Sequence, residues 1–133
     1  MEVQGECHCG AIAYKATVDP FTASLCNCAD CQTLSGSPFR ASVPAKAENF
    51  HLLRGEPTIY VKTAESGRQR AQAFCGKCGT PIYASAPKDT PTYALRLGAV
   101  KQRAEIPARK QIWCDSALDW AQNVADLPAS KKS

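Results

Sequence analysis

The chain has 133 residues, which is a typical length for one domain, and 44% of them are hydrophobic, enough to form a core. Its net charge is +4, and its basic residues are not interleaved with aromatic ones, which argues against a nucleic-acid-binding protein. No apolar run approaches the roughly 18 residues that span a membrane. The N-terminal residues 1–6 have neither a basic start nor an apolar run, so we expect no signal peptide and a cytoplasmic location, where thiols stay reduced.

The first notable segment is the cysteine pair Cys7-His8-Cys9. On an extended backbone, residues two positions apart point to the same face, so these two sulfurs can converge on one metal ion. Residues 11–18 alternate in polarity and contain β-branched side chains, which predicts a strand leaving this pair. Asp19-Pro20 predicts the turn that ends this strand.

A second cysteine cluster, Cys26-Asn27-Cys28-Ala29-Asp30-Cys31, follows on a predicted loop. Residues 30–35 are expected to form one short helical turn that ends at Gly36. Residues 38–43 then predict a strand.

The remaining chain alternates short apolar runs with turns, and it contains the third cluster, Cys75-Gly76-Lys77-Cys78. Gly76 lies within this cluster and Gly79 directly follows it, and both permit backbone angles that other residues resist. Strands are predicted over 50–53, 58–62, 69–74, 82–85, 93–97 and 112–113, turns over 54–57 and 65–67, a short helix over 116–124 and a frayed tail over 125–133. Strands separated by turns every 8 to 12 residues or so predict a mainly β fold of short antiparallel sheets with little helix, in a single domain over 1–133.

Seven of the eight cysteines therefore lie in three tight clusters, and only Cys114 stands alone. This clustering favours zinc, because thiolate ligands must converge in a tetrahedron. A disulfide framework is disfavoured because Cys7 and Cys9 would close a strained ring. A thioredoxin-like pair at Cys75 and Cys78 would open a helix, whereas residues 79–83 predict a turn entering a strand. An iron–sulfur cluster is the third alternative.

Counting ligands divides the cysteines into two predicted zinc sites. Cys7, Cys9, Cys75 and Cys78 supply four ligands and a closed structural site, which would join the start of the chain to its second half. The remaining three thiolates, Cys26, Cys28 and Cys31, predict an open site of the catalytic kind. The alternative is that a fourth protein ligand completes this site: Cys114, His8 or His51.

Several other residues carry more modest expectations. Ser35 and Ser37 are candidate hydrogen-bond donors in a pocket, and Arg40 is a candidate partner for a substrate carboxylate. The competing interpretation is that the serines belong to a turn and that Arg40 is an exposed strand residue. We expect His8 to lie at the surface and His51 to pack or lie at the surface. We expect Cys114, Trp113 and Trp120 to be buried.

Four motifs occur in a specific order: Cys-x-Cys-Gly at 7–10, Cys-x-Cys-x-x-Cys at 26–31, Ser-Gly-Ser-Pro-Phe at 35–39 and Cys-x-x-Cys-Gly-Thr at 75–80. Together they resemble the glutathione-dependent formaldehyde-activating enzyme family, which includes centromere protein V. The resemblance extends from Gly5 to about Trp120. Family members often carry histidine at the positions of Asn27 and Gln111.

This resemblance implies a β-tent-type fold with two zinc ions per chain. One would be structural, at Cys7, Cys9, Cys75 and Cys78, and the other would lie at the active site, at Cys26, Cys28 and Cys31. The activity implied is formation of S-hydroxymethylglutathione from glutathione and formaldehyde, a carbon–sulfur lyase reaction in the reverse sense.

The leading hypothesis is therefore a zinc-dependent enzyme of small-molecule thiol chemistry, with glutathione as a candidate partner. An open three-thiolate site favours capture of a substrate thiol, because soft ligands suit soft metal sites. One alternative is a non-catalytic zinc-stabilised binding module in which a protein ligand closes the second site. Another is a zinc carrier or sensor that uses the incomplete site.

Overall fold

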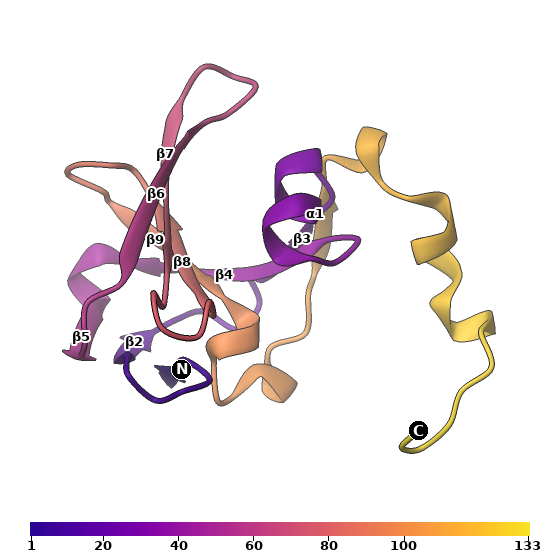
Figure 1. Cartoon of the computed structure of the whole chain (residues 1–133), viewed down its shortest axis with the longest axis horizontal. Helices are drawn as coiled ribbons and strands as arrows, with labels where there is room; N and C mark the ends of the chain where they lie inside the picture. The colour runs from indigo at the N-terminus through magenta and orange to yellow at the C-terminus, as the bar shows by residue number, and fades with distance from the viewer.

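The structure, a computed structural model, describes residues 1–133. Its strands form a three-stranded sheet in the order β1-β2-β5 and a seven-stranded sheet in the order β10-β3-β4-β9-β8-β7-β6. The single α-helix is α1 (Ala29–Ser35), and none of the helices is long and apolar enough to cross a membrane. The predicted mainly β class with little helix is confirmed (Figure 1).

The element bounds are as follows. The strands are β1 (Glu2–Glu6), β2 (Ala13–Thr17), β3 (Ser24–Cys26), β4 (Arg40–Lys46), β5 (Phe50–Arg54), β6 (Thr58–Thr63), β7 (Gln69–Phe74), β8 (Pro81–Ser85), β9 (Thr92–Arg96) and β10 (Lys110–Ile112). Short 3-10 helices are η1 (Ala47–Asn49), η2 (Leu97–Ala99), η3 (Arg103–Glu105), η4 (Cys114–Ser116) and η5 (Asp119–Asp126).

Three strands differ from the sequence-based expectation. The second cysteine cluster was expected on a loop, but Cys26 ends strand β3, which pairs with β4, and Cys31 lies in α1. The sequence analysis missed β1, which pairs antiparallel with β2 and buries Val3 and Gly5 on alternate positions. β10 pairs with β3 in parallel, so the sheets are not wholly antiparallel. β10 is recruited by pairing with a distant segment, whereas β1 pairs with the next strand of the chain; in both cases pairing, which leaves little signature in the strand's own residues, makes the strand.

The hydrophobic core lies on one face of the large sheet and continues into the small one. Val43 and Leu95 are directly opposite one another on β4 and β9, and both are fully buried. The Phe50 ring stacks on Tyr93 at 4.5 Å between centroids and lies 5.0 Å from the Tyr14 ring on β2. These aromatic contacts join the two sheets.

The other face of the large sheet is polar, because side chains alternate between faces along each strand. Arg40 and Ser42 of β4 lie on this face, and Ser42 is opposite Arg96 of β9. Gln72 of β7 reaches the same face, since its side chain accepts a hydrogen bond from Arg96. This polar face, and not the apolar one, forms the surroundings of the second cysteine cluster.

The C-terminal segment overturns three expectations about burial. After β10 the chain leaves the body of the protein, and its end lies far from both sheets (Figure 1). Trp113 and Trp120, expected in the core, are 48% and 62% exposed, and Cys114 is also exposed. Their local apolar character predicted burial, but no strand or helix packs over them there. The expected helix over 116–124 forms as the 3-10 helices η4 and η5, with a kink at Asn123.

Candidate metal centres

The first centre gathers the four cysteines that the sequence groups into a closed site. Cys7 and Cys9 follow β1 and Cys75 and Cys78 follow β7, and their four Sγ atoms all lie within 4.8 Å of one another. The Cys7–Cys9 and Cys9–Cys75 Sγ separations are 3.7 and 3.8 Å. Zinc–sulfur bonds of about 2.3 Å give a tetrahedron with an edge of about 3.8 Å. The donor set and its spacing therefore fit zinc.

Two tight turns present these sulfurs. Each turn ends at a glycine in the left-handed region, Gly10 at φ +82° and Gly79 at φ +81°. The backbone N–H of Gly10 donates to the Cys7 carbonyl at 3.0 Å, and that of Gly79 donates to the Cys75 carbonyl at 2.8 Å. Gly76 has a different role from the one expected: a Cβ there would lie 2.6 Å from Thr58 Oγ1, so glycine is required by close approach.

Thr80 links the two turns, and the sequence analysis did not select it. The His8 backbone N–H donates to Thr80 Oγ1 at 3.0 Å, which leaves the hydroxyl proton free to bond Cys78 Sγ at 3.2 Å. The Thr80 hydroxyl and backbone lower the pKa of Cys78 to about 5. The only signal in the sequence is the position of Thr80 directly after the second knuckle glycine. His8 itself is exposed, as expected.

The second centre comprises Cys26, Cys28 and Cys31, whose Sγ atoms also lie within 4.8 Å of one another. Cys26 ends β3, Cys28 is the N-cap of α1, and Cys31 lies in the first turn of this helix. The Cys31 N–H donates to Cys28 Sγ at 3.3 Å, so the helix cap and the sulfur cluster are one structure. All three residues are half-buried, which leaves the cluster within reach of a small molecule.

Ionisation of this trio depends on a cation. Burial opposes ionisation of Cys28, yet its pKa is lowered by the Cys31 N–H, by the neighbouring thiols and by the nearby Lys62 ammonium. Burial and the neighbouring sulfurs of Cys28 and Cys26 raise the pKa of Cys31 to about 12. Three thiolates this close repel one another, so a divalent cation is needed for all three to ionise. A soft thiolate donor set of this kind suits zinc.

A hydrogen-bonded clamp holds the loop of the trio against β10. Asn27 is 1% exposed, and its side-chain Nδ2 donates to Gln111 Oε1 at 3.2 Å and to the Ile112 carbonyl at 3.1 Å. Gln32 Nε2, a contact that the sequence analysis missed, donates at 2.9 Å to the carbonyls of both Asn27 and Ser116. Asn27 and Gln111 thus bind each other.

None of the three candidates for a fourth ligand belongs to this cluster of donor atoms. The mutually close donor atoms comprise three cysteines and no fourth His, Cys, Asp or Glu. His8 lies between two ligands of the first centre, where its backbone N–H donates to Thr80. His51 lies on β5 of the small sheet, opposite Lys15. Cys114 lies in η4 and is exposed.

Cationic side chains surround the trio on the polar face of the large sheet. Arg40 is directly opposite Cys26 in the β3–β4 register. Arg96 donates from Nη1 to Ser42 Oγ at 2.9 Å and from Nη2 to Gln72 Oε1 at 2.7 Å. Burial and then the nearby Arg40 lower the pKa of Arg96 to about 9, so it remains charged at neutral pH. Lys62 bridges β6 to α1 through Asp30 at 2.9 Å.

Two of the three remaining sequence candidates, Arg40 and Ser35, line a cavity, and the third, Ser37, does not. Arg40 and Ser35 line the same cavity of about 300 Å³, so Arg40 is not an exposed strand residue. Ser35 Oγ donates to the Phe39 carbonyl at 3.4 Å within the turn that follows α1. Ser37 lies in that turn and does not line this cavity.

Comparisons with known proteins agree with this arrangement. The sequence model of the family described as glutathione-dependent formaldehyde-activating enzyme matches residues 2–116. An uncharacterized lyase of Schizosaccharomyces pombe is 27% identical over 122 residues, which cover 89% of this chain and 82% of that protein. The crystal structure of a Rhodobacter sphaeroides protein has a TM-score of 0.62 at 18% identity, covers 81% of this chain and 98% of its own, and supports the fold alone. The chain belongs to the glutathione-dependent formaldehyde-activating enzyme family.

Proposed function

We propose that this chain is a zinc-dependent enzyme of the carbon–sulfur lyase type that acts on a small thiol adduct. The candidate reaction is formation of S-hydroxymethylglutathione from glutathione and formaldehyde. The observation that carries the proposal is the half-buried trio Cys26, Cys28 and Cys31, which converges without a fourth protein ligand. Structural zinc sites are four-coordinate from the protein, whereas catalytic sites keep one position open.

The reaction requires one proton transfer and one new bond. The substrate sulfur attacks the aldehyde carbon, a carbon–sulfur bond forms, and the carbonyl π bond breaks. The thiol proton ends on the former carbonyl oxygen, so the product is a hydroxymethyl thioether, and the lyase direction reverses each change. Zinc bound to the trio would favour the thiolate form of the substrate, which is the nucleophilic form.

The protein residues would hold and orient the reactants. The three cysteines would bind the metal, and the Asn27–Gln111 clamp fixes the loop that carries them. Lys62 is bound by Asp30 of α1 and lies close enough to Cys28 to favour its thiolate. The first centre lies at the ends of β1 and β7 and would be structural.

The test compares wild-type protein with Cys28→Ala, using Cys114→Ala as the matched control that removes an exposed cysteine outside both centres. Glutathione and formaldehyde react spontaneously, so the measured quantity is the acceleration of adduct formation and exchange, followed by NMR. We expect acceleration by wild type and Cys114→Ala and none by Cys28→Ala. If zinc-loaded wild type does not accelerate the reaction, the protein does not act on this substrate pair.

A further inference from the structure

Two buried arginines on the polar face of the large sheet have no acidic partner. Arg40 is 6% exposed and Arg96 is 9% exposed, and neither takes part in any of the ion pairs of the protein. The Nε atom of each guanidinium is buried and lacks a hydrogen-bond partner. Buried charges without partners are costly, so such groups are normally paired with an opposite charge.

The cysteine trio supplies only part of the missing negative charge. Three thiolates around a divalent cation carry one net negative charge, while Arg40, Arg96 and the neighbouring Arg70 carry three positive ones. Arg40, Arg70, Cys26 and Cys31 all lie close enough to Arg96 to affect its charge state. The nearest acid on α1, Asp30, is already bound by Lys62. The face therefore has a surplus of positive charge beside the trio.

The arginine cavity lies next to the trio, because Arg40 is directly opposite Cys26 in the β3–β4 register. Arg40 and Arg96 line the same cavity of about 300 Å³, together with Ser35 of α1. Ser35 is four residues after Cys31 on this helix, so both lie on one helix face, roughly 6 Å apart along the axis. A molecule with its sulfur at the trio can thus place a second group in the cavity.

We propose that Arg40 and Arg96 form a carboxylate-binding site that selects acidic thiols as substrates. The guanidinium geometry suits a carboxylate, which can accept two parallel hydrogen bonds. This inference rests on the proposed function, since the thiol of the same molecule would bind at the trio. It adds the substrate class: thiols with a carboxylate a few bonds from the sulfur bind, and neutral thiols of the same size bind weakly.

Calorimetric titration of the zinc-loaded protein tests the proposal with three probes. They are 3-mercaptopropionate, its neutral analogue 3-mercaptopropionamide, and propionate, which lacks the thiol. We expect the acidic thiol to bind at least about tenfold more tightly than the amide, because hydrogen bonds to charged groups contribute this much. Propionate should bind weakly and compete with the acidic thiol.

Three variants locate the effect. Arg40→Gln and Arg96→Gln should remove most of the preference for the acid and leave amide binding unchanged, while the exposed Arg68→Gln should match wild type. Arg40→Lys keeps the charge but not the paired donors, so it should lose preference at full zinc content even if Arg40→Gln folds poorly. Zinc content is measured for every variant.

The outcomes separate this proposal from the proposed function. Equal affinity of wild type for acid and amide, or a preference that survives in both glutamine variants, would overturn the carboxylate site and leave thiol binding intact. If 3-mercaptopropionate binds no more tightly than propionate, and both bind in an Arg40-dependent manner, the carboxylate site stands and the capture of thiols at the trio, on which the lyase proposal depends, fails.

Discussion

At the scale of single residues, the two centres differ in what stabilises their sulfurs. In the first centre, Thr80 accepts from the backbone of one turn and bonds the Cys78 sulfur of the other. In the second, the Cys28 sulfur accepts from the N–H of Cys31 and thereby caps α1. Both sulfurs have lowered pKa values, because hydrogen bonds to a thiolate favour the charged form.

The Thr80 contact predicts a pH effect. The pKa of Cys78 is depressed from its usual value to about 5. A group with a depressed folded-state pKa contributes stability that is present above its unfolded-state pKa and is lost as pH falls through the folded-state value, here about 5. Thr80→Val removes the hydroxyl donor and raises this pKa, so zinc should be released at a higher pH than from wild type.

Zinc release during acid titration, followed with a colorimetric indicator, measures this shift. Thr63→Val is the control, since Thr63 is an exposed threonine on β6, outside both centres. Identical release midpoints for Thr80→Val and wild type would show that the hydroxyl does not stabilise the thiolate.

At the scale of elements, the second centre depends on two consecutive elements and on one strand that is distant in the sequence. Strand β3 carries Cys26, the first turn of α1 carries Cys31, and β10 lies beside β3 in parallel register. The side chain of Asn27 joins the loop between β3 and α1 to β10 through Gln111 and Ile112. The buried amide thus orients the loop that presents the three sulfurs.

Replacement of Asn27 tests this role. Asn27→Ala removes two hydrogen bonds made by a buried side chain, so we expect it to lower the free energy of unfolding by about 1–3 kcal/mol. Zinc affinity at the trio should fall by about 10- to 100-fold, as when outer contacts of other metal sites are removed. Urea unfolding and chelator competition measure the two effects.

The control for this replacement is Asn123→Ala, because Asn123 is exposed in the C-terminal segment. The first centre should keep its zinc in both variants. An unchanged affinity of the trio in Asn27→Ala would mean that β10 does not orient the loop.

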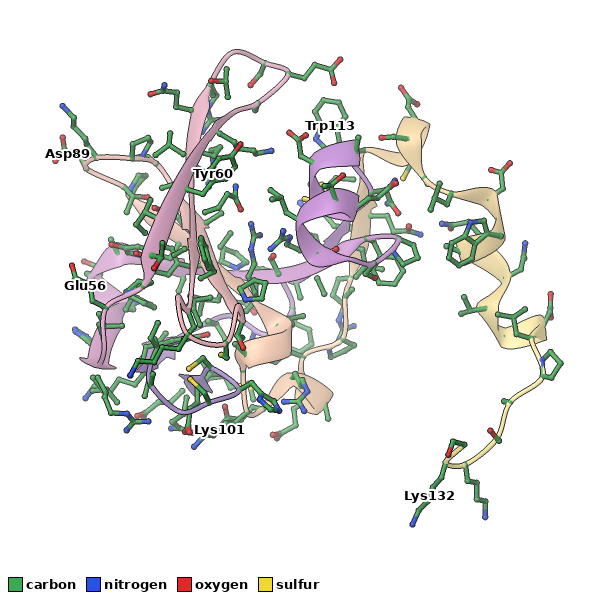
Figure 2. The ribbon with its side chains drawn as sticks, in the orientation of Figure 1. Glu56, Tyr60, Asp89, Lys101, Trp113 and Lys132 are labelled. Atoms are coloured by element: carbon green, nitrogen blue, oxygen red, sulfur yellow. The ribbon has the colours of Figure 1, made fainter.

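At the scale of the whole molecule, the first centre joins the two sheets. Its ligands follow β1 of the small sheet and β7 of the large one, and Cys9 and Cys75 are 66 residues apart. Binding of a metal at such a site is coupled to folding, because the unfolded chain does not present the four sulfurs together. The second centre lies at the start of α1, and Figure 2 shows the labelled Trp113 next to this helix.

Stepwise metal removal should distinguish the two centres. A mild chelator should remove one zinc of two from the half-exposed trio with little change in circular dichroism. Removal of the second zinc should abolish the cooperative thermal transition, and Cys75→Ser should have the same effect where Cys26→Ser does not. A reduced protein that melts cooperatively without any metal would contradict the structural role of the first centre.

Local spacing in the sequence was enough to predict the cysteine groups. Cysteines separated by only one or two residues need only a local turn to bring their sulfurs together, so the pairs Cys7–Cys9 and Cys75–Cys78 could be recognised from the sequence. The alternation of short apolar runs likewise predicted β4, β6, β7, β8 and β9 of the large sheet, because burial of one face imposes it. β1 and β3 escaped prediction, and β10 was predicted only at Ile112, since their partners, and not their own composition, make them strands.

The sequence by itself thus determined the mainly β class, the grouping of four and three cysteines, and the family to which the chain belongs. Only the tertiary structure decided that Trp113, Cys114 and Trp120 are exposed, and that Arg40 and Arg96 are buried without acids. The reason is the distance along the chain: Ser42 and Arg96 are 54 residues apart, and Asn27 and Gln111 are 84 apart. Contacts of this range depend on sheet order and register, which no short stretch of sequence encodes.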